Sequence, residues 1–408
     1  MYEAIRARVD AGDLDKIRFY DGLRMKPSFL LDPEALTKYA GHIDYMNCYG
    51  APVPSKAVFR SKTADFFPCN STDYPLKMAQ IIDVFMIAIC PPDSRGYCNI
   101  GLTNFFSLDL IRLGRKSGKM RVLIAEINDQ MPVVYGDNWV HVSDIDFFVE
   151  KSSPLVVGQR ATATGIETSI GKYALELIPD GATIQMGWGG ITETVVAGLE
   201  GKHDLGVLSE MFPAGLNNLV ESGIVTNRLK SEFTGVSIAS ITLGDQGLYD
   251  FVTENPGAQI YPSSVTNNLA MVSSHKNMIC MNAALQIDFT GQIAAEGIGN
   301  TMISGSGGQM EFAMGAAYAD GGKAVTMLAS SRKGKDGELI STLVPELEPG
   351  TPVSVPRTYT DYIITEYGIA HLRYKTRIER AKELIAISHP DLRGELRAAL
   401  KKNFYPGS

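Results

Sequence analysis

Glu210 is the residue whose type and position best fit catalytic chemistry. It lies in the segment HDLGVLSEMF at 203–212, where the apolar run 205–208 predicts a short buried strand. A glutamate directly after such a strand lies at the carboxyl edge of a sheet, where open α/β folds bind ligands. A carboxylate there can act as a nucleophile or a general base. By position alone, a solvated surface glutamate is the commoner case.

A first glycine-rich loop can supply backbone amides to an anion. The segment GATIQMGWGGITE at 181–193 runs from a predicted strand into a predicted helix. Free N–H groups and a helix N-terminus at such a junction favour a phosphate or a thioester oxyanion. An ordinary strand-to-helix turn explains these glycines equally well. The GxGG spacing, with no acidic residue clearly placed for a ribose, disfavours a nicotinamide-dependent enzyme.

A second loop, ISGSGGQMEF at 303–312, lies between a polar run at 297–301 and a helix predicted over 312–319. Its run of glycine and serine residues makes the backbone flexible, and such flexibility is costly in a core. A close approach of the backbone to a ligand is therefore favoured over a plain turn. By contrast, the cluster Gly321-Gly322-Lys323 predicts only a tight turn before a strand.

The elements that must position these loops follow an alternating β-loop-α pattern. Short runs rich in Val and Ile alternate with longer amphipathic segments, which predicts an α/β fold of parallel sheets covered by helices. The predicted strands lie at 83–89, 122–127, 182–186 and 324–328, with a further strand-like stretch at 141–149. Helices are predicted over 169–178 and 376–387.

The length of 408 residues favours two domains over one. A polar, Pro/Gly/Thr-rich stretch at 151–168 lacks periodicity and precedes a fresh helix-strand unit. We therefore predict an N-terminal α/β domain at 1–158 and a C-terminal α/β domain at 159–408 that carries Glu210.

Composition and charge exclude several classes of function. A formal net charge of -7 gives no basic surface for nucleic acid. Six histidines without metal-ligand spacing predict no metal site. Five scattered cysteines without a CxxC pair favour a reducing compartment. The first residues lack an apolar signal core, and no run reaches the roughly 20 apolar residues of a membrane helix. We expect a soluble cytoplasmic protein.

From about Pro91 onward, the sequence resembles the acetyl-CoA hydrolase/transferase family, a branch of the class I CoA transferases. The matching blocks are PPDSRGYCNIG at 91–101, EINDQMP at 126–132, HVSDID at 141–146, 180–190, SEMF at 209–212, 304–312, TEYG at 365–368 and SHPDLR at 388–393. The region that contains these ordered blocks, from about Pro91 to the C-terminus, spans more than three-quarters of the chain. The segment Met25-Lys26-Pro27 is similar to members that exchange butyrate and acetate.

The resemblance implies two open, mainly parallel-sheet α/β domains that face across a cleft, with Glu210 as the nucleophile. It implies transfer of CoA between a short-chain acyl-CoA and a small carboxylate through a glutamyl-CoA thioester. Coenzyme A or its acyl thioester is then a substrate, and the resemblance implies no permanently bound cofactor. A homodimer or higher homo-oligomer is expected. The residues implied to contact CoA or an oxyanion are Met186, Gly187, Trp188, Gly189, Gly190, Asn267, Asn282, Gly307, Gly308 and Lys333.

Several alternatives stay open at this point. The same residues can serve an acyl-CoA hydrolase, because water competes with the carboxylate acceptor, or a CoA-binding protein without turnover. Acetate, butyrate, 4-hydroxybutyrate and a dicarboxylate such as succinate or itaconate all remain candidate acceptors.

The chain departs from the family pattern in two places. It begins about one strand-helix unit later than the family does, which would expose a sheet edge or part of the cleft wall. In addition, Trp188 replaces a small aliphatic residue. Its indole either narrows the acyl pocket or packs against a neighbouring helix.

Overall fold

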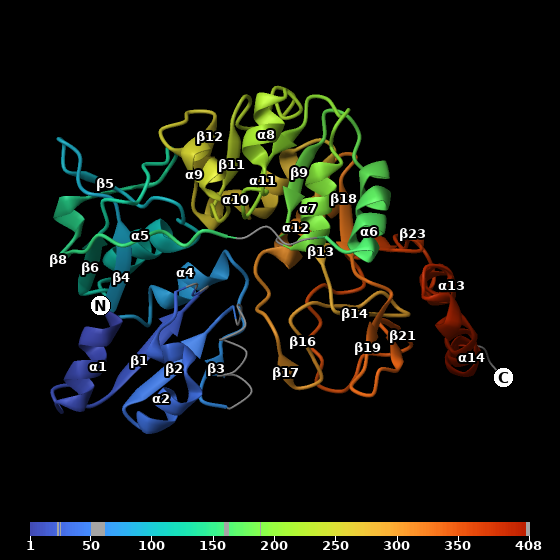
Figure 1. Cartoon of the computed structure of the whole chain (residues 1–408), viewed down its shortest axis with the longest axis horizontal. Coiled ribbons are helices and arrows are strands. Elements are labelled where there is room, and N and C mark those ends of the chain that lie inside the picture. The colour runs from blue at the N-terminus through green and yellow to red at the C-terminus, as the bar shows by residue number, and fades with distance from the viewer. Residues whose placement is uncertain (23, 25, 50–61, 159–162, 188, 405–408) are drawn as a thin grey trace.

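The computed structural model describes residues 1–22, 24, 26–49, 62–158, 163–187 and 189–404 (Figure 1). Parallel sheets flanked by helices dominate the described chain, as the alternating pattern predicts. No described helix is both long enough and apolar enough to cross a bilayer.

The largest sheet has six strands in the order β10-β9-β13-β18-β22-β23. All neighbouring pairs are parallel except β22 and β23. The bounds of these strands are β9 Thr183–Met186, β10 Gly206–Val207, β13 Met278–Ala283, β18 Lys323–Met327, β22 Tyr362–Thr365 and β23 Gly368–His371.

This sheet is buried on both faces, because successive residues of its central strand enter different cores. On β13, Ile279 and Met281 pack into one apolar cluster, and Met278 and Cys280 pack into the cluster on the other face. That arrangement explains why the strand reads as a continuous apolar run and not as an alternating one. Helices α6 (Gly165–Glu176), α7 (Gly190–Ala197) and α12 (Gln309–Tyr318) supply residues to these two cores.

Two three-stranded parallel sheets make up much of the first 150 residues, in the orders β1-β2-β3 and β4-β6-β8. Among the described strands, β1 pairs with β2 alone and β4 pairs with β6 alone. A cavity of about 1130 Å³ is lined by residues of both β1 and β4. The elements of this half are α1 Tyr2–Asp10, β1 Ile17–Asp21, α2 Pro33–Lys38, β2 Ile43–Asn47, β3 Asp65–Phe66, α4 Asp73–Met78, β4 Val84–Ile89, β5 Tyr97–Asn99, α5 Ser107–Ser117, β6 Val122–Ile127, β7 Trp139–His141 and β8 Phe147–Glu150.

The remaining strands and α-helices of the second half of the chain lie around the six-stranded sheet (Figure 1). They are α8 Leu216–Glu221, β11 Ser237–Ala239, α9 Gln246–Val252, β12 Ala258–Ile260, α10 Ser263–Thr266, α11 Leu269–Ser274, β14 Gln286–Asp288, β15 Ile293–Ala294, β16 Gly297–Ile298, β17 Thr301–Met302, β19 Ser331–Lys333, β20 Leu339–Ser341, β21 Leu343–Val344, α13 Arg377–Ala386 and α14 Arg393–Phe404.

The predicted strands at 83–89, 122–127, 182–186 and 324–328 are confirmed as β4, β6, β9 and β18. The turn at Gly321-Gly322 is confirmed as well, because Gly321 has a φ of 68° and β18 begins at Lys323. The helix predicted from residue 169 starts earlier, at Gly165. The Thr164 hydroxyl oxygen accepts a hydrogen bond from the Glu167 backbone amide, and the Glu167 carboxylate accepts one from the Thr164 backbone amide, which forms a capping box.

The prediction of one strand over 141–149 is wrong. β7 ends at His141, whose imidazole accepts a hydrogen bond from the Ser143 amide and caps a 3-10 turn. The chain then enters β8, which pairs with β6 in a different sheet. The division into domains at residues 158 and 159 stays a prediction, and residues 159–162 lie outside the described part.

Candidate active site

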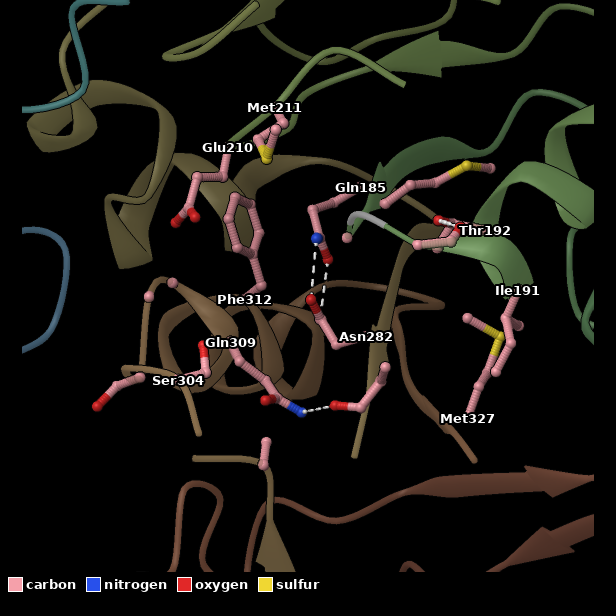
Figure 2. A pocket seen from close by; sticks show the side chains of 18 of the residues that line it. Gln185, Ile191, Thr192, Glu210, Met211, Asn282, Ser304, Gln309, Phe312 and Met327 are labelled. Carbon is pink, nitrogen blue, oxygen red and sulfur yellow. Dashed lines mark hydrogen bonds between the residues drawn. The ribbon is translucent and has the colours of Figure 1, made fainter. Parts of the chain in front are cut away.

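Glu210 lies beyond the carboxyl end of β10, as predicted, but its side chain is not solvated. Its exposed fraction is 9%, and it lines a cavity of about 450 Å³. The Glu210 carbonyl accepts hydrogen bonds from the amides of Ser240 and Ile241 at 3.0 and 2.9 Å. In Figure 2 the Glu210 side chain reaches toward the start of α12, beside Phe312. The alternative of a surface glutamate is therefore wrong.

Three donors surround the Glu210 carboxylate. The Asn267 side-chain amide donates to Oε2 at 2.7 Å, and the Ser71 hydroxyl donates to the same oxygen at 3.0 Å. The backbone amide of Gly308 also hydrogen-bonds the carboxylate. Burial is the largest effect and raises the pKa of Glu210 to about 7 from its ordinary value of 4.5. The hydrogen bond from Asn267 opposes this rise, and the charge of Glu311 adds to it.

The second glycine loop packs against this carboxylate. A Cβ at Gly308 would lie 2.1 Å from Asn267 Nδ2 and 2.4 Å from Glu210 Oε2. Gly307 has a φ of 53°, and a Cβ at Gly305 would lie 2.0 Å from the carbonyl oxygen of Cys48. The structure shows a close approach of this loop to protein groups. The loop also lines the cavity, and its close approach to a ligand stays a prediction. Glycine is needed because the loop backbone contacts the candidate nucleophile and its neighbours.

The first glycine loop lies on another wall of the cavity. Met186, Gly187, Gly189 and Gly190 all line it. A Cβ at Gly190, the first residue of α7, would lie 2.5 Å from Glu167 Oε1, so a side chain is excluded there as well. Trp188 lies outside the described residues, and its predicted role stays a prediction.

Three other predicted contacts have different surroundings. Asn282 lines the cavity and forms a reciprocal amide pair with Gln185, at 3.1 and 3.2 Å, across β13 and β9 (Figure 2). Asn267 binds Glu210 directly. Lys333 is exposed on β19 and is not among the described residues that line the cavity. Its role as a CoA contact therefore stays a prediction.

Sequence reasoning missed four residues of this site: Tyr49, Ser71, Thr72 and Glu311. Tyr49 lines the cavity. Burial is the larger cause that raises the pKa of its phenol, and the charge of Glu210 adds to it. Ser71 is 139 positions from Glu210 and lies in a segment without a recognisable motif. Glu311 lies within the second glycine block, but its neighbours mark it only as a helix start.

The arrangement is suited to acyl-transfer chemistry. A buried carboxylate has lost much of the hydration that weakens it as a nucleophile in water. The Gly308 amide and the Asn267 amide are fixed donors beside it, and such donors stabilise a developing oxyanion. Within the part of the chain that the structure describes, no group of three or more His, Cys, Asp or Glu side chains is arranged to hold a metal ion.

Comparisons with known proteins indicate the family of the chain. Residues 244–400 match the model of the acetyl-CoA hydrolase/transferase C-terminal domain. The chain is 39% identical over 348 residues to a 4-hydroxybutyrate coenzyme A transferase of Clostridium kluyveri, an alignment that covers 84% of this chain and 79% of that protein. It is 32% identical to a succinyl-CoA:cyclohexane-1-carboxylate CoA transferase of Geobacter metallireducens, over 94% of this chain and 86% of that protein.

A solved structure extends the likeness to the whole fold. The crystal structure of RipA from Yersinia pestis superposes with a TM-score of 0.88 at 31% identity, and covers 98% of this chain and 90% of that chain. The sequence blocks, the family match and the relatives at more than 30% identity agree. The chain belongs to the acetyl-CoA hydrolase/transferase family.

Proposed function

We propose that this protein is a CoA transferase that moves CoA from a short-chain acyl-CoA to a small carboxylate through a covalent intermediate on Glu210. The observation that carries the proposal is the buried Glu210 carboxylate, which lines a 450 Å³ cavity and contacts the Gly308 amide and Asn267. The names of the relatives, which are CoA transferases, support the same reaction class.

The reaction balances without an added energy source. A Glu210 oxygen attacks the thioester carbonyl carbon and expels CoA thiolate, which leaves a mixed anhydride. The thiolate then attacks the γ-carbonyl carbon of Glu210, expels the first carboxylate and leaves a γ-glutamyl-CoA thioester. An incoming carboxylate reverses these steps. Each tetrahedral oxyanion is stabilised by backbone and side-chain donors, typically by about 3–4 kcal/mol per donor.

A binding protein without turnover is disfavoured by the same carboxylate. CoA ends in a thiol that is itself acidic, and a site that only binds it gains nothing from a negative charge beside the sulfur. Hydrolysis remains the competing outcome at the same residues, because water can attack either acyl intermediate.

The adduct on Glu210 is the direct test. We expect acetyl-CoA, added without an acceptor, to increase the protein mass by the mass of CoA less one water. Peptide mapping should locate this mass on Glu210, and hydroxylamine or borohydride should cleave it. The absence of an adduct together with steady thiol release would contradict the transferase and favour the hydrolase.

The charges on the cavity wall predict which acceptors react. Among the described residues that line the cavity, the charged side chains are Glu167 and Glu210, both acidic. A second carboxylate on the acceptor would lie near negative charge without a described cation to pair with it, which is costly in a buried site. We therefore propose monocarboxylates as the acceptor class.

A panel of acceptors tests that proposal. With acetyl-CoA as donor, acetate, butyrate and 4-hydroxybutyrate should exchange faster than succinate or itaconate, by roughly tenfold or more. Free thiol measured with and without each acid separates transfer from hydrolysis. Succinate exchange as fast as butyrate exchange would show that a cation outside the described lining reaches the acceptor.

A further inference from the structure

A second buried carboxylate lies beside Glu210. Glu311 is in the first turn of α12 and has an exposed fraction of 9%. The Asn267 side-chain nitrogen donates to Glu311 Oε2 at 3.3 Å and to Glu210 Oε2 at 2.7 Å. One amide group therefore bridges two carboxylates. It brings them within the range of about 4–6 Å over which charges shift each other's ionisation.

The other oxygen of Glu311 is held from a distant part of the chain. Thr72 donates its backbone amide to Oε1 at 3.0 Å and its hydroxyl to the same oxygen at 2.5 Å. Charge-assisted hydrogen bonds of this kind are stronger than neutral ones. The Glu311 carboxylate is thus fixed at both oxygens, and it connects the segment before α4 to the start of α12.

The orientation of the bridging amide is fixed as well. The Thr266 hydroxyl lies 2.8 Å from Asn267 Oδ1 and donates to it. The oxygen end of the amide is therefore occupied, and the nitrogen end faces the two carboxylates. Asn267 is 1% exposed, so water cannot substitute for these partners without moving the side chain.

We propose that Glu311 is a positioning residue of this site, which orients the Asn267 amide on Glu210 and holds a second negative charge beside the nucleophile. The proposal rests on the proposed function, because its purpose is tied to acylation of Glu210. When Glu210 becomes an acyl group in the anhydride or the thioester, it loses its charge. The repulsion from Glu311 is then relieved, so the charge on Glu311 favours the covalent intermediate over the free carboxylate.

Among the residues that the structure describes, no cation is recorded as acting on Glu210, so the repulsion is largely uncompensated there. The described titratable groups that interact with Glu210 are Glu311 on α12 and Tyr49 after β2, and a third acidic group, Glu167, lines the same cavity. Asp73 adds a further negative charge near Glu311. Burial is the largest effect and raises the pKa of Glu311, and the charge of Asp73 acts in the same direction. The hydrogen bonds from Thr72 and Asn267 oppose that rise.

Two variants of Glu311 separate charge from packing. Glu311→Gln keeps the size of the side chain, removes the charge and replaces the acceptor oxygen that faces the Asn267 amide by an NH2 donor. We expect the acid limb of the rate of adduct formation to move to lower pH by about one unit, and the rate above pH 8 to fall about tenfold. Glu311→Asp keeps the charge, so the pH midpoint should stay at the wild-type value although the rate falls. Glu383→Gln, an equal loss of charge on α13, should match the wild type.

A readout without substrate keeps the proposal independent of the reaction. Glu210→Gln should raise the Tm at pH 8, because it removes one of two repelling charges. Glu311→Gln relieves the same repulsion but weakens the hydrogen bonds from Thr72 and Asn267, so its own shift is the sum of a gain and a loss. The Tm shift of the double variant should be lower than the sum of the two single shifts, since the same repulsion cannot be relieved twice. At pH 5, where Glu210 is protonated, the Tm shifts should add.

The outcomes are distinguishable. Additive Tm shifts at pH 8, or an unmoved pH midpoint in Glu311→Gln, overturn the role proposed for Glu311. A wild-type protein that forms no adduct but shows non-additive Tm shifts overturns the proposed function and supports the charge coupling between the two glutamates.

Discussion

Replacing Glu210 by glutamine will lower the rate of CoA exchange by roughly 10⁴-fold or more, because the change removes the attacking oxygen anion and leaves the rest of the cavity in place. Glutamine is nearly isosteric with glutamate, and its amide is a far weaker nucleophile. The measurement is the conversion of acetyl-CoA and butyrate to butyryl-CoA, followed by chromatography, with intact-protein mass as a second readout. Neither exchange nor adduct should be detected.

Two controls sharpen that result. Glu210→Asp keeps the carboxylate but withdraws it by one methylene, so exchange should fall by roughly 10²-fold or more because a small misplacement is costly in this chemistry. Glu383→Gln on α13 should leave exchange unchanged, since Glu383 pairs with Lys375, both side chains are half-buried, and neither lines the cavity that holds Glu210. Exchange at full speed in Glu210→Gln would refute nucleophilic catalysis by this residue.

Local sequence patterns predicted the part of the site that lies next to regular elements. Glu210 follows a buried apolar run, so its place at the carboxyl edge of the sheet follows from strand geometry alone. Its burial did not follow, because the groups that cover it come from elsewhere. Ser71 and Asn267 are 139 and 57 positions away. Without the family resemblance, nothing in the local sequence separates this glutamate from a solvated one.

The glycine loops show a similar limit. Their spacing predicts a close backbone approach, and Gly308 indeed leaves no room for a side chain. The sequence does not reveal what approaches, because the neighbours Asn267 and Glu210 lie on other elements. Thr72 illustrates the extreme case, since its contact with Glu311 spans 239 positions. Long-range partners of this kind have no local signal.

The sequence predicted the fold class and the main strands. The boundaries of strands and helices were predicted less well where a side-chain hydrogen bond sets them. The stretch 141–149 has the apolar composition of one strand, yet the imidazole of His141 caps a turn and divides it between two sheets. The early start of α6 is likewise set by a capping box at Thr164, which lies outside the apolar periodicity used to find the helix.

The stability of Glu210→Gln gives the second large effect. Burial raises the folded-state pKa of Glu210 to about 7, above its ordinary value of 4.5. The contribution of the protonated group to stability is therefore fully present below about pH 4.5 and is lost as the pH rises through about 7. Above that pH the folded protein carries a buried charge at a cost of about 3 kcal/mol. Glutamine removes this cost, so the variant should be more stable than the wild type at pH 8.

Thermal unfolding at two pH values measures the effect. At pH 8 the Tm of Glu210→Gln should exceed that of the wild type by several degrees, and at pH 4.5 the difference should nearly vanish. An equal or lower Tm at pH 8 would mean that the folded protein does not hold a destabilised carboxylate. A residue that lowers stability while ionised is retained only where its charge is used. The same substitution that abolishes exchange should therefore stabilise the fold, which is expected of a nucleophile and not of a glutamate that supports structure.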